Sequence, residues 1–533
     1  MQHQAAGSLT AMNLYSEDLL TEKNNGCSWT RTRGNSRKPS RRTSFAQRLR
    51  LRATANRWDA GQVTIDLLPD DVLLEILAFY MEETSFYSID TWHTLVHVNR
   101  KWRIVVFGSP RRLKLRLQCG TARKRSRQTL DIWPALPIVL WQHDHLAWDT
   151  NSDNIMAALE HHNRVCEIKL WDASSSQLEK VLAVVKDPFP ALTSVLLRSR
   201  SEIAHAISNS FLSGSAPRLQ ELTFDGIAFP GLPKLLSSSA HLVELELWRI
   251  PHSGYISPEA MVSCLSTLTR LERLCLKFQS PHSSPQSRRP APHSRSVLPA
   301  LTYFRFKGVS EYLEDFVARI DAPMLDKLDI TFFHQLIFDT PNLPQFVSRS
   351  PNLKGHDEAC VAVSDSGVRI APVRPFVRGF PVDLEISCRQ SGWQLSSLAQ
   401  VCRSTFPHTF ICSLETLYIR EDEYHGNLQV HWQDDAENSQ WLELLHPFTA
   451  VKNLYLSKEF TPRIASVLQE LVGERVEETL PALRGLFLED VELSGPVQDA
   501  IGQFVAARQL SGHPIAVSHW GKDQDEWLKV DSG

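Results

Sequence analysis

The sequence predicts an α/β fold with two parts, an N-terminal all-helical segment and a solenoid whose parallel strands lie inside and helices outside. Two observations lead to this prediction. Between Val165 and Leu488, an apolar residue followed by two others, three and five positions later, recurs ten times. Segments with helical patterning separate these apolar triples. Alternation of short strands and helices favours parallel strands stacked along one side and helices along the other.

The triples recur at a nearly constant interval. The first seven begin 27, 27, 23, 29, 30 and 24 residues apart. Alternation over the last positions of each triple predicts a short strand with one buried face. A degenerate repeat, Pro381/Leu384/Ile386, is expected in the otherwise unassigned stretch from Asn352 to Phe410. The ten triples are Val165/Ile168/Leu170, Leu192/Val195/Leu197, Leu219/Leu222/Phe224, Leu242/Leu245/Leu247, Leu271/Leu274/Leu276, Leu301/Phe304/Phe306, Leu325/Leu328/Ile330, Leu414/Leu417/Ile419, Val451/Leu454/Leu456 and Leu483/Leu486/Leu488.

This spacing resembles the leucine-rich repeat, whose L-x-x-L-x-L core recurs about every 20–29 residues. The family has Asn or Cys eight residues after each start. In this chain other residues occupy that position, so we expect the hydrogen bonds between the loops of successive repeats to be irregular. The residues found there are Ala173, Arg200, Ile227, Ile250 and Gln279.

Helices are expected between the strands. The clearest begins at Ser257, where Ser-Pro-Glu is typical of a capped helix N-terminus. The four expected helices are Gln177–Lys186, Glu202–Ser213, Ser257–Leu268 and Ser310–Ile320.

A second distinctive segment runs from Leu67 to Leu117 and reads as two or three short helices. Its first helix opens at Pro69, which needs no N–H in the first turn. Asp70 and Asp71 follow, where acidic groups favour the positive end of the helix dipole. So small a helical unit buries little surface and would normally dock on another protein.

This segment resembles an F-box, the module that binds the Skp-type adaptor of a cullin–RING ubiquitin ligase. The resemblance rests on the opening Leu-Pro-Asp-Asp-Val-Leu and on the closing Val-Asn-Arg-Lys-Trp. Asn99 stands where the family usually has Cys, and the gap from Met81 to Thr94 is longer than usual. The resemblance implies adaptor binding through Leu67, Leu68, Pro69, Val72, Leu73, Ile76, Leu77, Val98 and Trp102.

Four regions follow from these patterns. Residues 1–60 are expected to be a disordered basic arm, because Arg31–Arg57 holds ten Lys or Arg and no acidic residue. Residues 61–118 form the F-box-like domain, and 119–164 a linker and N-terminal cap of the solenoid. Residues 165–533 form the solenoid, with a Ser/Pro/Arg loop at 280–296. Four tryptophans are expected to pack the junction between F-box and solenoid: Trp133, Trp141, Trp148 and Trp171.

Composition excludes several classes of protein. A hydrophobic content of 42% and a net charge of −3 are typical of a folded chain. No apolar run approaches the ~18 residues that a membrane span needs. The nine cysteines form no CxxC pair and there is no Asn-x-Ser/Thr sequon. Both absences favour an intracellular setting, cytoplasm and/or nucleus.

No motif for catalysis or cofactor binding is recognisable. The chain has no GxGxxG, GxxxxGK[ST], GxSxG or HExxH. His143-Asp144-His145 lacks a second pair at ligand spacing, and the cysteines near His408 match no zinc pattern. We therefore expect a protein that is not an enzyme and holds no cofactor or metal.

The candidate binding surface follows from strand geometry. If the second and third residues of each triple point inward, the residues between and after them point outward. The outward residues form an acidic patch of Glu221, Asp225, Glu244 and Glu246, followed by a basic patch of Arg273, Lys277, Arg305 and Lys307. Trp171 and Trp248 would be apolar anchors. We expect this concave face to bind a charged protein segment, and a phosphorylated one would suit the basic patch.

The chain most resembles the large fungal families of F-box-like proteins with leucine-rich repeats. That resemblance implies a substrate-recognition subunit of an SCF-type ligase, with partners comprising a Skp-type adaptor, the cullin–RING ligase and a protein substrate. One alternative is a repeat scaffold whose F-box-like segment only caps the solenoid. The other is a nucleic-acid binder using the arm at Arg31–Arg57 and the patch at Arg273–Lys307. Nucleic acid is disfavoured because the outward residues lack interleaved aromatic and basic residues.

Overall fold

The computed structural model describes residues 68–84, 92–119, 126–142, 148–200, 205–281, 294–353, 357–364, 366–371, 382–388, 391–405, 413–421, 437–471, 475, 478–489 and 495–521. The chain divides into two compact units, residues 1–73 and 74–533. The predicted basic arm, Leu67 and most of the Ser/Pro/Arg loop lie outside the described residues.

The described part of the first unit is the start of helix α2 (Asp70–Thr84). Asp70 and Asp71 occupy its first turn, and the Leu73 N–H donates to the Pro69 carbonyl at 3.0 Å. The predicted helix start at this proline is therefore confirmed. Leu73 is fully buried, whereas Val72 is exposed.

The second unit begins with the rest of α2, followed by α3 (Trp92–Val98) and α4 (Arg100–Gly108). Asn99 ends the first of these short helices and begins the second, because its side chain accepts a hydrogen bond from the Trp102 N–H at 2.8 Å. Trp92 is buried and its ring lies 5.1 Å from that of Trp133. Its indole N–H donates to the Arg116 carbonyl at 2.8 Å.

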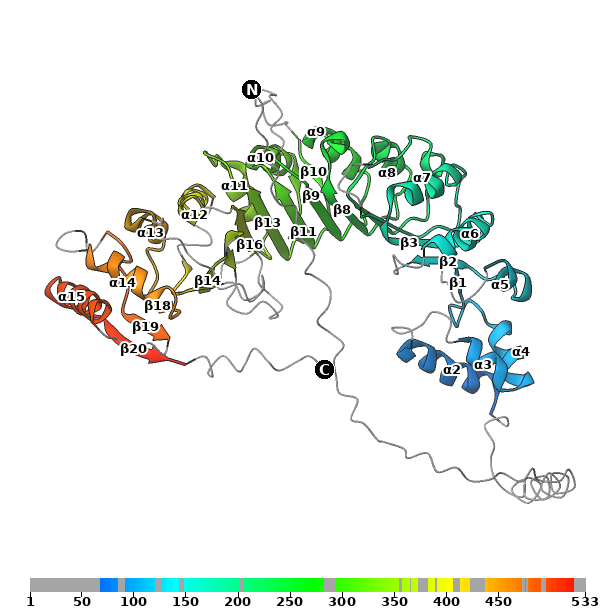
Figure 1. Cartoon of the computed structure of the whole chain (residues 1–533), viewed down its shortest axis with the longest axis horizontal. Coiled ribbons are helices and arrows are strands. Elements are labelled where there is room, and N and C mark those ends of the chain that lie inside the picture. The colour runs from blue at the N-terminus through cyan, green and yellow to red at the C-terminus, as the bar shows by residue number, and fades with distance from the viewer. Residues whose placement is uncertain are drawn as a thin grey trace, which may run out of the picture. The chain divides into compact units, whose positions relative to one another are not determined.

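One large sheet of 16 strands organises the rest of this unit, and its order is β1-β2-β3-β4-β6-β8-β9-β11-β13-β16-β15-β14-β17-β18-β19-β20. Figure 1 shows the helices along one side of the sheet. The strands are β1 (Leu117–Cys119), β2 (Ile138–Gln142), β3 (Val165–Ala173), β4 (Ser194–Ser199), β6 (Glu221–Asp225), β8 (Glu244–Ile250), β9 (Arg273–Phe278), β11 (Tyr303–Gly308), β13 (Lys327–Phe333), β14 (Glu358–Val363), β15 (Gly367–Ala371), β16 (Val382–Ser387), β17 (Thr416–Glu421), β18 (Asn453–Leu456), β19 (Gly485–Glu489) and β20 (Ala516–Trp520). The helices are α5 (Ser126–Ile132), α6 (Trp148–Leu159), α7 (Ser175–Val184), α8 (Leu232–Ser237), α9 (Pro258–Leu265), α10 (Ser310–Val317), α11 (Asn342–Arg349), α12 (Ser391–Thr405), α13 (Asn438–Leu445), α14 (Thr461–Gln469) and α15 (Pro496–Leu510).

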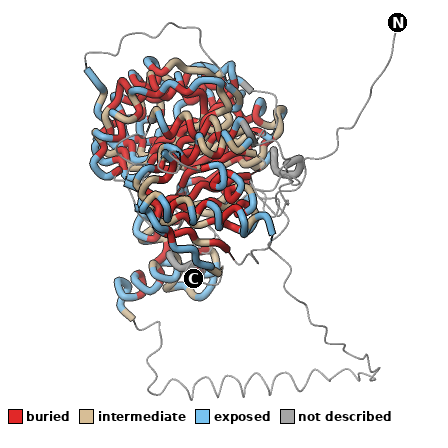
Figure 2. The backbone as a smooth tube through the Cα atoms, turned by 90° about the vertical axis from the view of Figure 1, so that its left-hand side faces the viewer, coloured by how far each residue is buried: buried red, intermediate tan, exposed pale blue. Residues whose placement is uncertain are grey.

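The predicted strand register is confirmed. Leu222, Leu245 and Leu274 are opposite one another on consecutive parallel strands, and all three are fully buried. Figure 2 shows the buried residues in the interior of the repeats and the exposed ones at the periphery. The core therefore lies between the inward side of the sheet and the helices.

The sheet begins earlier than the first predicted triple at Val165. Strand β1 pairs in parallel with β2, which pairs in parallel with β3. In β2 the residues Ile138, Val139 and Leu140 are all buried. A continuous apolar run of this kind lacks the alternation that identifies the later strands.

The order of the sheet changes between β13 and β17. Strand β16 pairs in parallel with β13. Strand β15 pairs antiparallel with both β16 and β14, and β14 then pairs in parallel with β17. Leu384 and Ile386 are buried in β16, which confirms the degenerate repeat. Pro381 lies outside the described residues. A Cβ at Gly367 would lie 2.5 Å from the Ile386 carbonyl oxygen, so this antiparallel contact requires glycine.

Helices were correctly predicted at α7, α9 and α10, and the Ser257 side chain accepts from the Ala260 N–H at 3.3 Å. The helix predicted over Glu202–Ser213 is wrong. Its described part contains the two-residue strand β5 (His205–Ala206) and the 3-10 turn η3 (Phe211–Gly214). The Ser208 hydroxyl accepts from the Ser210 N–H at 3.2 Å, a local bond that competes with helix formation.

Candidate functional site

The face of the sheet away from the helices, called here the helix-free face, carries the predicted binding residues. Hydrogen-bonded register places them in three rows across adjacent strands, which lie about 4.8 Å apart. The first row is Glu221, Glu244, Arg273, Tyr303 and Lys327, and the second is Thr223, Glu246, Cys275, Arg305 and Asp329. The third includes Lys277, Lys307 and Thr331.

Three of the four predicted acidic residues come together. Glu221 and Glu244 are register partners, and Glu246 is two residues further along β8 on the same face. Burial raises the pKa of Glu244, nearby Arg273 opposes that rise, and Glu221 and Glu246 add to it. Glu244 is therefore the member of this cluster whose ionisation is disfavoured, first by its burial and then by the two neighbouring carboxylates.

Asp225, the fourth predicted acidic residue, is neutralised by two arginines. It forms ion pairs with Arg198 at 3.2 Å and with Arg249. The Arg249 guanidinium also donates to the Ser199 carbonyl at 2.8 Å, so one side chain connects β4, β6 and β8. Arg249 has a φ of 46° where the register of β8 shifts, and its left-handed backbone aims the side chain back across the sheet. No sequence pattern indicated this role.

The basic patch is divided into paired and unpaired cations. Arg305 donates two hydrogen bonds to Asp329, at 3.0 and 2.6 Å, and Arg273 lies 3.6 Å from Glu244. Lys277 and Lys307 are register partners, and neither forms an ion pair with a described carboxylate. Burial lowers the pKa of Lys277, and the positive charges of Arg305 and Lys307 lower it further.

Aromatic rings alternate with these cations, contrary to the expectation that such interleaving is absent. Lys277 lies 4.1 Å from the centre of the Trp248 ring, and Arg273 lies 4.6 Å from that of Tyr303. Lys307 lies 5.5 Å from the Phe333 ring. The face of Trp248 is therefore already in contact with a cation of its own chain.

The second predicted anchor does not join Trp248. Trp171 is half-buried near the end of β3, beyond Leu170, where the register between β3 and β4 shifts. Strands β4 and β6 separate it from β8, a distance of about 14 Å at the usual strand spacing. The structure thus brings the charged residues together but not the two tryptophans.

The predicted adaptor-binding residues differ in exposure. In the first unit Leu68 is half-buried, while Pro69 and Val72 are exposed and Leu73 is buried. In the second unit, Ile76 and Val98 are exposed, Trp102 is half-buried and Leu77 is buried. Leu67 lies outside the described residues.

Further exposed apolar side chains were missed in the second unit. Phe79 is 70% exposed, and Tyr80 and Ile104 are also exposed. Ile76, Phe79 and Tyr80 are spaced three and four residues apart, so they share one face of α2. This spacing could have revealed Phe79 and Tyr80 in the sequence.

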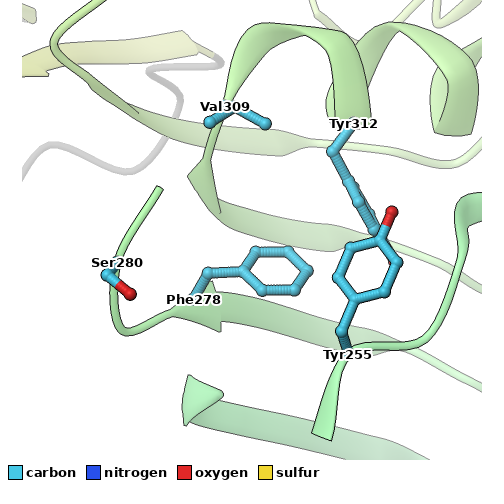
Figure 3. Close-up of a pocket in the computed structure, with 5 residues that line it drawn as sticks. All are labelled: Tyr255, Phe278, Ser280, Val309 and Tyr312. Atoms are coloured by element: carbon cyan, nitrogen blue, oxygen red, sulfur yellow. The ribbon is translucent and has the colours of Figure 1, made fainter. Parts of the chain in front are cut away.

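A crevice at the ends of β9 and β11 is too small for a substrate pocket (Figure 3). Its empty volume of about 160 Å³ includes space open to solvent. Typical ligand pockets measure roughly 300–1,000 Å³. It is lined by Tyr255, Phe278, Ser280, Val309 and Tyr312. The Tyr312 hydroxyl is already used, since it donates to the Ile256 carbonyl at 3.1 Å.

The described ranges contain neither a metal-binding cluster nor a membrane-spanning helix. No group of three or more His, Cys, Asp or Glu side chains there could hold a metal ion. No helix there combines the length and hydropathy needed to cross a membrane.

Comparison with known proteins adds little to this description. The chain matches no protein-family model and no curated protein. Among solved structures, it is similar to the leucine-rich repeat-containing protein LegL7 from Legionella pneumophila, with 14% sequence identity and a TM-score of 0.25. The match covers 66% of this chain and 92% of that one. So low a TM-score carries no argument, and the description as leucine-rich-repeat-like rests on the chain's own mostly parallel sheet.

Proposed function

We propose that this chain is the substrate-recognition subunit of an SCF-type ubiquitin ligase, in which the F-box-like helices bind a Skp-type adaptor and the repeats bind a protein substrate. The observation that carries the proposal is the exposed apolar face of α2, formed in the second unit by Ile76, Phe79 and Tyr80. Large side chains exposed together on a short helix are typical of a surface that a partner covers. The sequence around them carries the F-box resemblance.

Adaptor binding is tested by co-purification. We expect a chain with both Ile76→Ser and Phe79→Ser to lose the Skp-type adaptor that the unmodified chain retains, and Leu68→Ala with Pro69→Ala to do the same. The matched control is Leu510→Ser, which removes an equally large side chain that is 89% exposed in α15. Unchanged thermal unfolding of all variants would show that the solenoid remains folded.

If the unmodified chain binds no adaptor under mild conditions, the ubiquitin role is wrong. The remaining function would then be the repeat scaffold. The proposal that the helix-free face binds a protein does not depend on adaptor binding, and it is tested by a separate experiment.

On the helix-free face, the proposed centre of substrate binding is the Lys277–Lys307 pair. Like charges at opposed positions on neighbouring strands repel each other. A phosphate group between them would relieve this repulsion and accept hydrogen bonds from both ammonium groups. A phosphorylated protein segment is therefore the proposed substrate, with its basic part toward Glu221, Glu244 and Glu246.

Inorganic phosphate can test this subsite before the substrate is known. Phosphate that binds only the folded chain raises its unfolding temperature by mass action. We expect this rise in the unmodified chain and in the control variant Lys452→Gln. Lys452 directly precedes β18, away from β9 and β11, and forms an ion pair with Glu415. A chain with Lys277→Gln and Lys307→Gln should show no rise. Equal rises in all three chains would contradict a phosphate site at this pair.

The interleaved cations and rings favour single-stranded nucleic acid as a second candidate ligand. Against it, the cationic strands β9 and β11 are flanked by strands that carry carboxylates, Glu244 and Glu246 in β8 and Asp329 in β13. A long polyanion would have to cross these groups. Oligonucleotide binding that weakens steeply with salt, and disappears with Lys277→Gln and Lys307→Gln, would establish this second candidate.

A further inference from the structure

A short loop after β13, residues 334–338, displays two large aliphatic side chains to solvent. Leu336 is 83% exposed and Ile337 is 72% exposed. Scattered exposed apolar residues are ordinary on protein surfaces, but two consecutive ones at such exposure are not.

The loop is anchored on both sides of this pair. The His334 N–H donates to the Ser387 carbonyl at 3.2 Å. The Gln335 side chain accepts from the Ser310 N–H at 2.8 Å and donates to Glu311 at 2.7 Å, which ties the loop to the start of α10.

Beyond the pair, the Phe338 N–H donates to the Gln400 side chain at 2.8 Å, and the Phe338 ring is buried. Three of the five loop residues are thus fixed by packing or hydrogen bonds. Leu336 and Ile337 are presented to solvent by a held backbone. Such a preorganised surface loses little conformational entropy when a partner covers it.

A third apolar side chain comes from a different element. Trp393 in α12 is 51% exposed, and its ring stacks on that of His334 with centroids 4.8 Å apart. The Ser397 hydroxyl lies 3.4 Å from the other side of that imidazole, at Nδ1. The tryptophan is therefore held beside the loop, and aromatic residues of this kind are common anchors of protein interfaces.

The surroundings of this apolar surface are acidic. Glu311 and Asp339 are both exposed, and they flank the loop on its two sides. Burial raises the pKa of Glu314 to about 6, and the charge of Asp339 contributes to that rise.

We infer that Leu336, Ile337 and Trp393, with Glu311 and Asp339 beside them, form a second docking surface for a protein segment that carries bulky apolar side chains next to lysine or arginine. The apolar groups of the segment would cover the aliphatic pair and the indole. Its basic groups would meet the two carboxylates. The surface is separate from the helix-free face, and it does not depend on the function proposed above.

The same charges exclude the other classes of occupant. Nucleic acid and anionic lipid headgroups would be repelled by Glu311 and Asp339. A small molecule would find no enclosed volume at this convex loop, because both aliphatic side chains are mostly exposed.

Three synthetic peptides of equal length test the inference by fluorescence polarisation with the full chain. One alternates leucine and lysine, the second replaces lysine by glutamate, and the third replaces leucine by serine. We expect the leucine–lysine peptide to bind at least about tenfold more tightly than either of the others, since both its charge and its apolar groups are used.

Variants locate that binding. Leu336→Ser with Ile337→Ser should weaken it at least about tenfold, whereas Leu510→Ser, which removes an exposed leucine elsewhere, should leave it unchanged. Glu311→Gln with Asp339→Asn should reduce the preference for lysine over glutamate. Equal affinity for the lysine and glutamate peptides would overturn the inference, as would tight binding by the Leu336→Ser, Ile337→Ser chain. Unfolding temperatures measured on the same samples show whether each variant is folded.

Discussion

Lys277 is the register partner of Lys307 on the neighbouring parallel strand, and no described carboxylate forms an ion pair with either ammonium group. Each lies over an aromatic ring instead, Trp248 and Phe333. The charge of Lys307 disfavours the charged form of Lys277, whereas the carboxylate of Glu385 favours it.

Removal of one of these charges should therefore stabilise the free chain. We expect Lys277→Met to raise the free energy of unfolding by about 0.2–1 kcal/mol at low salt, measured by urea denaturation. Added salt should reduce this gain, since salt screens the repulsion that the substitution removes. A loss of stability would show that the contact with Trp248 outweighs the repulsion.

The strand register predicts a sharp contrast between inward and outward positions. Leu222→Ala, Leu245→Ala and Leu274→Ala should each lower the free energy of unfolding by about 2–5 kcal/mol, because each leaves a cavity in the core. Glu221→Ala and Glu244→Ala, on the helix-free face, should each change it by about 0.5 kcal/mol or less. Equal effects at both sets of positions would contradict the register.

Glu314 should make stability depend on pH. Its carboxylate accepts from the N–H groups of Asn342 and Leu343, at 2.7 and 3.0 Å, and so caps α11. Burial nevertheless raises its pKa to about 6, so the folded chain holds this proton more tightly than the unfolded chain does. The stabilisation is fully present below the unfolded pKa near 4.5 and is lost as pH rises through about 6.

The measurement compares the unmodified chain with Glu314→Gln from pH 4.5 to 7. The stability of the unmodified chain, relative to the variant, should fall by about 2 kcal/mol over this range. A constant difference would mean that the pKa of Glu314 is the same in the folded and unfolded chains.

Asn99 is the N-cap residue of α4. Its side chain accepts a hydrogen bond from the Trp102 N–H at 2.8 Å, which satisfies one of the free N–H groups of the first turn. Asn99→Ala should cost about 0.5–2 kcal/mol and Asn99→Asp much less, as measured by thermal unfolding of the full chain. A similar loss for both substitutions would mean that another contact of Asn99 matters more.

The apolar triples were predictable because burial of alternate residues produces a regular spacing of apolar side chains. That spacing is still recognisable when the residues between them differ from repeat to repeat. Leu245 and Leu247 are inward for that reason, and the outward positions of Glu244 and Glu246 follow automatically. The charge partners were not predictable, because the backbone turn at Arg249 decides that its guanidinium reaches Asp225 and Ser199. The pairing of Arg305 in β11 with Asp329 in β13 likewise depends on which cation lies nearest to the Asp329 carboxylate.

The β14–β15 pair escaped the sequence analysis for a different reason. Ala359 to Val363 are all buried, so β14 shows no alternation between exposed and buried residues. An antiparallel pair also breaks the repeat that made its neighbours recognisable.

That antiparallel insertion also sets the order in which the chain can be assembled. Strands β2 to β13 of the large sheet each pair with the strand completed just before them, so this part can grow one repeat at a time as the ribosome releases it. The second edge of β13 stays unpaired for longer, since β16, which pairs with it, follows β14 and β15 in the chain. Closing the longer intervening segment costs additional chain entropy and slows this step. A nascent chain that ends at Arg349 would leave β13 as an open edge, able to pair with another copy, until Ser387 has been added.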